Sequence, residues 1–377
     1  MYISLKEFLE LFTKEKPKDI NEYILNAKVK MVKNIIPLKI YLNRKNIILE
    51  EDIIKNIEPL FNHIKNREKY LTLFYNRSLN VKDVIDDEKI NNEKLNNNSI
   101  LKNKIRSLFI KEILTDTKSG FDNKPSFMDV LFDLYQYPDS IIDYKLITPS
   151  AIYYTKNERI GSIFSSFYFR ASIMSPVLVH NIRIKYFPNI KTLLTPTLGW
   201  CSYLMGFSLL KSERLKHYVG IDIIDSVCYH AKNTILGNFP PEKIDIYNCQ
   251  SEKIIDNYND FYTIYNNYFD VIFFSPPYYK MELYNGERQS TTQYKTYDDW
   301  LYNYWVKTIK MCKKVIKKGG IMSYIVSPFD KYDLPNDLLN ITNKYFTLKE
   351  IIPIYNKNIN STKHRSPNDN LYIYNVN

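Results

Sequence analysis

A run of apolar residues that ends at two prolines constrains the fold of this 377-residue chain more than any other stretch. The run is Val271–Phe274, and Ser275-Pro276-Pro277-Tyr278 follows it directly. Consecutive β-branched and aromatic residues without polar alternation predict a central strand that is buried on both faces of a sheet. Because proline lacks an N–H and fixes φ, the two prolines end the strand and make the chain leave the sheet extended and rigid.

The residues of this turn also suit the binding of a planar amine. Ser275 offers a hydroxyl and a carbonyl, Pro276 offers a carbonyl, and Tyr278 offers a flat ring. Such oxygens can accept the two hydrogens of an exocyclic amine while the ring stacks on the heterocycle, a contact worth about 1 to 3 kcal/mol. A purely structural turn after a strand would explain the same four residues. Other features of the sequence are therefore needed to distinguish an amine-binding turn from a structural one.

Apolar segments that alternate with helical patterns extend on both sides of this strand. The predicted strands begin near Thr192 and cover 218–223, 244–248, 271–274, 321–326, 346–354 and 371–376. Helical patterns lie between them, at 176–184, after Gly199, at 226–236 and at 298–317, the last of which is followed by a glycine pair. This alternation predicts an α/β doubly wound, Rossmann-like sheet of seven mostly parallel strands, with ligands bound at the carboxyl ends of the strands.

Four polar or glycine-containing corners fall at such strand ends. They are the turn at Gly199, the acid Asp222, the pair Gln250 and Ser251, and the turn from Ser275 to Tyr278. Asp222 follows Gly199 by 23 positions. A gap of about 20 residues separates the glycine turn from the ribose-binding acid in nucleotide-binding βαβ units. The four corners are therefore expected to line one crevice.

Residues from about 164 to 377 resemble a class I, S-adenosylmethionine-dependent amino-methyltransferase of DNA. Ser275-Pro276-Pro277-Tyr278 matches the (Asp/Asn/Ser)-Pro-Pro-(Tyr/Phe/Trp) catalytic motif of enzymes that methylate adenine N6 or cytosine N4. The segment 195–206 resembles the Asp-Pro-x-x-Gly-x-Gly loop for the methyl donor, and its position before the catalytic motif is like the γ arrangement.

The resemblance implies S-adenosylmethionine as the cofactor, a reaction without a metal, and DNA as the partner, with RNA also possible. It assigns catalysis to Ser275, Pro276, Pro277 and Tyr278. It assigns the cofactor to Thr195, Pro196, Gly199, Trp200, Asp222, Ile223, Gln250 and Ser251, with Asp222 on the ribose and Gln250-Ser251 near the adenine ring.

Two residues depart from the family pattern. Thr195 stands where the family has an acid, and Cys201 stands where it has its second glycine. A catalytically degenerate homologue that binds nucleic acid is therefore one alternative. An RNA or protein-amide methyltransferase with the same motif is another. A dehydrogenase on the same sheet would explain the spacing from Gly199 to Asp222 but not the Ser-Pro-Pro-Tyr turn.

The first part of the chain has mostly helical patterns in place of alternating strands and helices. This difference predicts a mainly helical, basic domain at 1–150 and the catalytic domain at 151–377. Leu5, Phe8, Leu9 and Phe12 recur at helical spacing, as do Ile53, Ile54, Ile57 and Leu60. A further helix is predicted at 101–114, and the asparagine-rich segment 91–98 is predicted to be an exposed loop. The basic side chains of 101–114 suit either a solvated face or a contact with nucleic acid, so 1–150 is a candidate target-recognition module.

Charge, cysteines and hydropathy set the broad class. The net charge of +11 favours a polyanion such as nucleic acid or an anionic membrane, although a composition rich in Lys, Asn, Ile and Tyr is also typical of AT-rich coding sequence. The segment 280–297, with Lys280, Arg288 and Lys295, suits either contact with DNA or a solvated loop.

There is no apolar run of about 18 residues, so no membrane span is predicted. Without a signal-peptide pattern or paired cysteine spacings, a cytoplasmic or other reducing compartment is expected.

Overall fold

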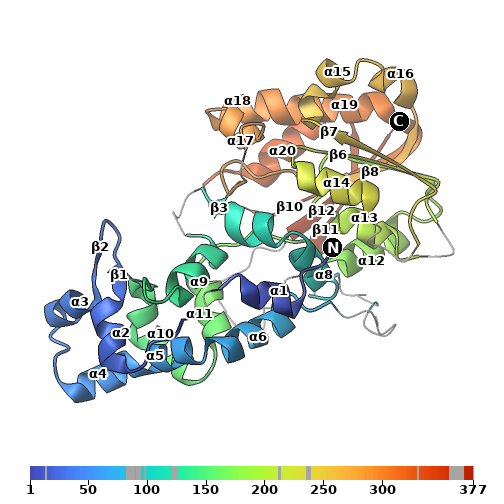
Figure 1. Ribbon diagram of the computed structural model, residues 1–377. Coiled ribbons are helices and arrows are strands. Elements are labelled where there is room, and N and C mark those ends of the chain that lie inside the picture. Colours follow the sequence, from blue (N-terminus) through green and yellow to red (C-terminus); the bar gives the residue numbers. More distant parts are fainter. Residues whose placement is uncertain are drawn as a thin grey trace. The chain divides into compact units, whose positions relative to one another are not determined.

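The chain folds into two compact units in the computed structural model of Figure 1. Unit 1 comprises Met1–Val81 and Arg106–Ala171, and unit 2 comprises Lys82–Ile105 and Ser172–Asn377. The structure describes residues 1–12, 15–81, 90, 95–96, 99–120, 125–210, 214–234, 239–284, 286–328, 331–355 and 369–376, without the side chains of 160, 165 and 166. Most of the asparagine-rich segment 91–98 lies outside these residues.

Unit 2 is built on a seven-stranded sheet with the order β11-β12-β10-β8-β5-β6-β7. The strands are β5 (Thr192–Thr195), β6 (His217–Asp222), β7 (Lys243–Asn248), β8 (Phe269–Phe274), β10 (Ile316–Val326), β11 (Thr347–Ile354) and β12 (Asp369–Asn375). The five strands from β10 to β7 pair in parallel, whereas β12 runs antiparallel to both of its neighbours. The predicted α/β, Rossmann-like sheet of seven mostly parallel strands is confirmed.

The order of the strands places a switch point beside β5. The chain proceeds from β5 to β6 and β7 on one side, and then returns to place β8 on the other side of β5. Ligands of doubly wound sheets bind outside the carboxyl ends of the strands at such a point. The corners that follow β5 and β8 therefore flank the expected ligand crevice.

Strand β8 is buried on both faces, as the sequence predicts. Phe273 packs against Phe207 of α13 (Ser202–Phe207), with 5.8 Å between ring centroids, and against Phe187 at the end of α12 (Pro176–Tyr186). The next residue, Phe274, packs against Trp305 at 5.7 Å. Because successive strand residues point to opposite faces, these contacts place α12 and α13 on one face and the segment around Trp305 on the other (Figure 1).

The helix predicted at 298–317 is divided and ends early. It consists of α18 (Tyr297–Trp300), a π-helical segment (Leu301–Val306) and α19 (Lys307–Val315), after which β10 begins at once. The predicted glycine stop lies inside β10 instead, where the register with β8 shifts between Ile316 and Ile321. The other short elements of unit 2 are α14 (Asp225–Asn233), a 3-10 turn (Ser251–Lys253), α15 (Ile254–Asn257), α16 (Phe261–Tyr265), β9 (Glu282–Leu283), α17 (Ser290–Gln293) and α20 (Leu334–Thr342).

Unit 1 is mainly helical and also contains a small sheet with the order β2-β1-β4. Its early elements are α1 (Leu5–Glu10), α2 (Ile20–Asn26), β1 (Lys28–Lys30), β2 (Ile35–Pro37), α3 (Leu38–Arg44), α4 (Glu50–Asn56), α5 (Glu58–Lys65) and α6 (Arg67–Ser78). The helix predicted across Ile53 and Leu60 breaks at Ile57, because Pro59 suits the first turn of a new helix and not a helix interior.

The later part of unit 1 runs beyond residue 150. It contains a π-helical segment (Glu112–Asp116), β3 (Lys118–Ser119), α9 (Phe127–Tyr135), β4 (Ile141–Asp143), a 3-10 turn (Tyr144–Ile147), α10 (Pro149–Lys156) and α11 (Ile160–Phe167), and α8 (Lys102–Leu108) spans the join with unit 2. Phe164 of α11 packs on Phe127 with ring centroids 4.8 Å apart. This packing keeps α11 in unit 1, so unit 2 resumes at Ser172 and not at 151. No helix among the described residues is long and apolar enough to cross a membrane.

Candidate functional site

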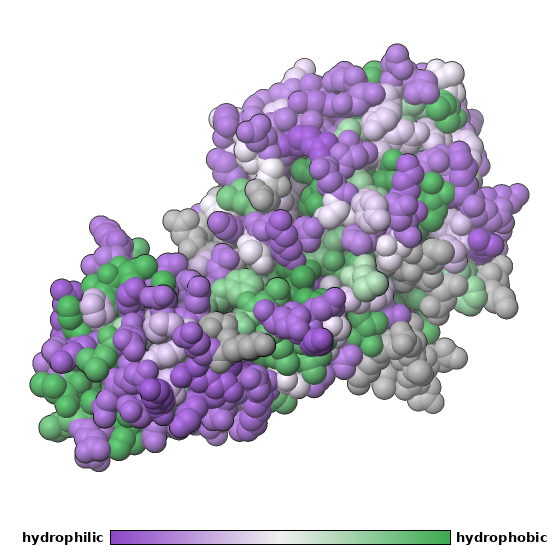
Figure 2. Space-filling model, in the orientation of Figure 1, coloured by the Kyte–Doolittle hydropathy of each residue, from purple (hydrophilic) through white to green (hydrophobic). Residues whose placement is uncertain are grey.

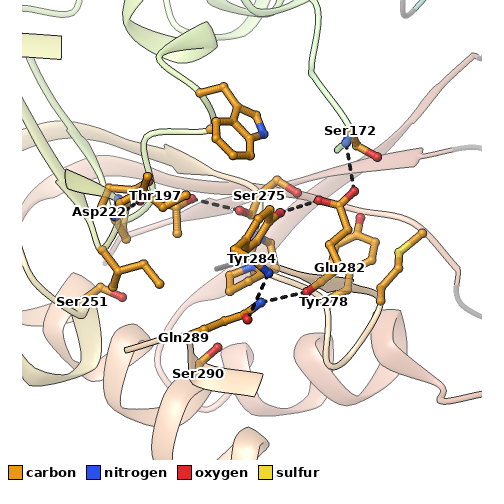
Figure 3. Close-up of a pocket in the computed structure, with 18 of the residues that line it drawn as sticks. Ser172, Thr197, Asp222, Ser251, Ser275, Tyr278, Glu282, Tyr284, Gln289 and Ser290 are labelled. Carbon is orange, nitrogen blue, oxygen red and sulfur yellow. Dashed lines mark hydrogen bonds between the residues drawn. The ribbon is translucent and has the colours of Figure 1, made fainter. Parts of the chain in front are cut away.

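A cavity of about 420 Å³ opens at the carboxyl ends of the strands of unit 2 (Figure 3). Its walls come from the segments that follow β5, β6, β7, β8 and β10. Among the residues predicted for the site, the cavity is lined by Pro196, Gly199, Trp200, Asp222, Ile223, Gln250, Ser251, Ser275, Pro276, Pro277 and Tyr278. Four corners that are distant in sequence thus share one cavity.

The glycine corner after β5 has an unusual backbone. Gly199, Trp200 and Cys201 have positive φ angles of 52°, 57° and 60° in succession. A Cβ atom on Gly199 would lie 2.4 Å from the ring of Tyr203, so both conformation and space require glycine there. The non-glycine residues at 200 and 201 adopt the same left-handed region at a cost of about 1 to 2 kcal/mol each. Such strain is typical of sites where the backbone is shaped for a ligand.

Asp222 holds this corner in place. One carboxylate oxygen accepts a hydrogen bond from the Leu198 N–H, and the other accepts one from the Ile224 N–H, both at 3.0 Å. Burial raises the pKa of Asp222, and the backbone N–H groups oppose that rise. The carboxylate at the end of β6 therefore lines the cavity and also fixes the turn that faces it.

Thr195 lies elsewhere than predicted, in the core and not in the wall of the cavity. It is the last residue of the central strand β5, its exposed fraction is 0%, and its Oγ1 lies 2.6 Å from the Tyr218 hydroxyl. Cys201 is also buried, with its Sγ 3.6 Å from the Val227 carbonyl oxygen. Thr197, which the sequence patterns did not single out, lines the cavity instead and donates from Oγ1 to the Ser275 carbonyl at 3.0 Å.

The position of Thr195 leads to a first prediction. The substitution Thr195→Val keeps the volume but removes the hydroxyl, and leaves the buried Tyr218 hydroxyl without this partner. A loss of about 1 to 3 kcal/mol in the free energy of unfolding is expected, as is usual for an orphaned buried polar group. Affinity for a ligand of the cavity should stay within twofold. Chemical denaturation and calorimetry measure the two quantities, and a large loss of ligand affinity at unchanged stability would contradict this placement.

The proline corner after β8 is tied to the glycine corner. The Ser275 N–H donates to the Tyr203 hydroxyl at 3.1 Å, and the Ser275 carbonyl accepts the Thr197 hydroxyl. The Ser275 carbonyl is therefore already engaged, in contrast to the free acceptor expected from the sequence. Ser275 and Pro276 both line the cavity, and the Ser275 side chain also hydrogen-bonds with Tyr278.

The ring of Tyr278 lines the cavity and is anchored at its far end. The Tyr278 hydroxyl accepts from the Ser327 N–H at 2.6 Å and donates to Ser327 Oγ at 3.3 Å. Ser327 Oγ donates in turn to the carboxylate of Asp369. Burial raises the pKa of Asp369 to about 6, and the charge of Lys102 opposes that rise. A chain of three side chains thus fixes the plane of the Tyr278 ring.

The wall opposite these corners comes from the segment 282–293, which was expected to be a DNA contact or a solvated loop. Glu282 accepts from the Ser172 N–H at 3.0 Å and from the Tyr284 hydroxyl at 2.5 Å (Figure 3). The Gln289 side chain donates to the Glu282 carbonyl at 2.8 Å. Burial raises the pKa of Glu282, and its bonds to Tyr284 and Ser172 oppose that rise.

Arg288 fastens this wall to the sheet. Its guanidinium donates to the Asn248 side-chain oxygen at 2.7 Å, to the Ile223 carbonyl at 2.7 Å and to Asp225 at 2.6 Å. Arg288 is thus engaged with the ends of β6 and β7 and is not a free cation waiting for a phosphate. Nothing local in the sequence marks Glu282 or indicates the partners of Arg288, because those partners lie far away along the chain.

Gln250 and Ser251 are also held in place. The Gln250 amide donates to the Gln293 side-chain oxygen at 2.7 Å, and Ser251 Oγ lies 3.3 Å from Thr308 Oγ1. Within the described residues, no group of His, Cys, Asp or Glu side chains is arranged to hold a metal ion. The donor set of the cavity is made of hydroxyls, amides, carboxylates and aromatic rings, which suits an organic ligand.

Comparisons with known proteins return only distant structural likeness. No family model and no curated protein matches the chain. N-methyltransferase NodS from Bradyrhizobium japonicum has 11% identity and a TM-score of 0.33, over 50% of this chain and 87% of that one. TrmN from Thermus thermophilus has 12% identity and a TM-score of 0.35, over 55% of this chain and 50% of that one. Trm1 from Pyrococcus horikoshii, in complex with S-adenosyl-L-methionine, has 12% identity and a TM-score of 0.33, over 53% of this chain and 54% of that one. Likeness at this level says nothing about activity.

Proposed function

We propose that this chain transfers a methyl group from S-adenosylmethionine to an exocyclic amine in DNA, adenine N6 or cytosine N4. The observation that carries the proposal is the shared cavity. The glycine corner with Asp222 and the Ser-Pro-Pro-Tyr corner line the same space, and the bond from Thr197 to the Ser275 carbonyl joins them. A donor site and an amine site must adjoin in this way for direct transfer.

The donor would occupy the half of the cavity formed by the ends of β5, β6 and β7. Asp222, Gln250 and Ser251 line this half of the cavity. Asp222 would accept from two neighbouring hydroxyls such as those of a ribose, and Gln250 and Ser251 would contact the adenine ring. The residues of this half fit the donor, since they combine a partly buried carboxylate with the apolar side chains of Trp200 and Ile223. When bound, S-adenosylmethionine supplies a methyl group that its sulfonium already activates.

The amine would occupy the other half, at the proline corner. The Ser275 hydroxyl and the Pro276 carbonyl accept its two hydrogens and stabilise the positive charge that develops on nitrogen during transfer. The proton leaves to water afterwards, so no metal and no covalent nucleophile is required. The Tyr278 ring stacks on the base, which offsets part of the few kcal/mol needed to flip a base out of duplex DNA.

The chain from Tyr278 through Ser327 to Asp369 leads to a prediction on pH. Ionised Asp369 accepts from Ser327 Oγ, so that Ser327 Oγ accepts from the Tyr278 hydroxyl. Protonation near pH 6 reverses the first of these bonds and loosens the ring. Base affinity should therefore rise about fivefold as the pH increases through 6, the equivalent of one net hydrogen bond. The step should be absent in Asp369→Asn and in Ser327→Ala.

The same group has the opposite effect on stability. The pKa of Asp369 is raised in the folded chain from the ordinary value of 3.8 to about 6, so folding is favoured below pH 3.8 and that contribution is lost as the pH rises through 6. The difference between the two limits is about 3 kcal/mol on the scale of 1.36 kcal/mol per pKa unit. Asp369→Asn should thus be more stable than the parent at pH 7 in urea denaturation. A less stable variant, or a pH step that persists in Asp369→Asn, would contradict this role.

Mass spectrometry of digested nucleic acid tests the proposed function. The full chain is incubated with a labelled methyl donor and with DNA, RNA and a protein mixture in parallel. We expect label in N6-methyladenine or N4-methylcytosine of DNA, and none after Ser275→Ala. If the label appeared only in RNA or only in protein, that molecule and not DNA would be the substrate. If no molecule were labelled and the donor did not bind, the chain would be a degenerate homologue.

A further inference from the structure

One segment of unit 1 combines cations with exposed apolar side chains. Residues 25–49 contain six basic residues and no acid. The cations are Lys28, Lys30, Lys33, Lys39, Arg44 and Lys45. The same segment exposes Leu25, Val32, Ile35, Ile40, Ile48 and Leu49, with 80% of Val32 and 70% of Leu49 accessible. Figure 2 shows apolar atoms at the surface over this part of unit 1, interspersed with hydrophilic ones.

The segment folds as a short β-hairpin followed by a helix, and its strand β1 also pairs in parallel with β4. We name residues 25–49 the basic hairpin surface. β1 and β2 pair antiparallel, with Lys28 opposite Pro37 and Lys30 opposite Ile35, and the Met31 N–H closes the turn on the Asn34 carbonyl at 2.7 Å. Val29 points inward and is 0% exposed. Because strand residues alternate, the outer face carries the lysines, and Val32 and Lys33 occupy the tip.

Helix α3 continues this surface with its polar side outward. Leu38, Tyr41 and Leu42 are buried against unit 1, whereas Lys39, Ile40 and Arg44 are exposed. A helix that lies on a lipid surface presents its wide apolar face outward. In α3 that face is turned inward and the outward face is cationic, which favours a polyanion of fixed shape over a bilayer.

Two acids of unit 1 approach the hairpin from α9 and the segment after it. Asp139 lies 3.5 Å from the Lys28 ammonium, and Asp133 lies 3.7 Å from that of Lys30. Pairs as exposed as these are worth about 0 to 1 kcal/mol, less than the gain from replacing them with phosphate contacts along a polyanion. The cations at 33, 39, 44 and 45 extend the positive surface beyond these two acids.

We propose that the basic hairpin surface docks on duplex DNA, with the β1–β2 turn at a groove and α3 along the phosphates. This inference rests on the proposed function, which makes DNA the substrate, and it names the surface that receives it. Because β1 is the central strand of the sheet β2-β1-β4, the turn at 31–34 is the part that can approach a groove. There the exposed Val32 can contact thymine methyl groups or sugars, and the neighbouring lysines and arginine can neutralise phosphates. Docking there keeps duplex on the protein independently of the methylation cavity.

Fluorescence anisotropy with a labelled duplex of random sequence tests the proposal in the full chain, without donor, over a range of salt concentrations. The test variant is Lys33→Gln/Lys39→Gln/Lys45→Gln. The matched control is Lys307→Gln/Lys310→Gln/Lys314→Gln, which removes the same charge from exposed positions of α19. We expect the test variant to lose at least tenfold in duplex affinity at low salt. The slope of log K against log salt concentration should become less steep by about 2 to 3, because each lost phosphate contact changes that slope by about 0.9.

The control variant should change duplex affinity by less than twofold, and Val32→Ser should weaken it with an unchanged salt slope. Equal losses in test and control variants, or no duplex binding by the parent chain, would overturn the proposal. So would binding to phosphatidylserine vesicles that the test variant loses while its DNA affinity stays intact. The binding assay needs no methyl transfer, so it separates the two proposals. Duplex binding through this surface without DNA methylation would refute only the proposed function. DNA methylation together with an unchanged duplex affinity of the test variant would refute only the docking surface.

Discussion

Alanine in place of Asp222 is expected to lower the affinity for S-adenosylmethionine by about 100-fold or more, since two hydrogen bonds to a charged group are worth about 3 kcal/mol or more together. In the proposed function, the carboxylate accepts from two ribose hydroxyls. It also holds the N–H groups of Leu198 and Ile224 at 3.0 Å, so the substitution loosens the glycine corner in addition. Asp222→Asn keeps one acceptor and should lose less.

Titration calorimetry with S-adenosylmethionine and S-adenosylhomocysteine measures this loss. Asp225→Asn is the matched control, because Asp225 lies nearby, is exposed, and pairs with Arg288. Its donor affinity should stay within a few-fold of the parent chain. Thermal unfolding of each variant separates a local change from a loss of fold. Unchanged donor affinity in a folded Asp222→Ala variant would remove Asp222 from the site.

Tyr278→Ala is expected to lower kcat/KM for DNA by about 10- to 100-fold, since a base stack is worth about 1 to 3 kcal/mol. Donor affinity should change by less than twofold, because the ring lies at the proline corner and not among the ends of β6 and β7. Tyr278→Phe keeps the ring but loses the bonds to Ser327, and should fall between the parent and the alanine variant.

The matched control for this prediction is the neighbouring residue. Tyr279→Phe removes a hydroxyl that donates to the Lys295 carbonyl at 2.6 Å, outside the cavity lining. Stability is expected to fall slightly in this variant, with little change in kcat/KM. Steady-state kinetics with DNA and calorimetry with the donor provide both readouts. If Tyr278→Ala weakened donor and DNA to the same extent, the ring would be a packing residue only.

The fold was predictable from the sequence where its signals are local. The apolar run 271–274 has no polar alternation and ends at prolines, and it forms the buried strand β8 as expected. The polar and glycine corners at Gly199, Asp222 and Gln250 could be placed at one edge, because the carboxyl ends of parallel strands lie on the same side of a sheet. Periodicity and topology together were sufficient for this much.

What could not be predicted depends on contacts between distant parts of the chain. Thr195 resembles a donor-loop residue in sequence, but β5 is one residue too long to release it, and its hydroxyl meets Tyr218 in the core. Glu282 and Arg288 lie in a segment without clear periodicity, and only the folded sheet gives them Ser172, Asn248 and Ile223 as partners. Likewise, α11 belongs to unit 1, although its sequence lies beyond residue 150.

The hydroxyl of Thr197, bonded to the Ser275 carbonyl at 3.0 Å, has a consequence for the kinetics of the reaction. In the proposed reaction, this bond would fix the distance between the donor site and the amine site before either substrate binds. Two ligands that bind to preset positions need no mutual adjustment, so either of them can enter first. The rate of the chemical step then depends on how rigidly that span is kept and much less on how tightly each ligand is held.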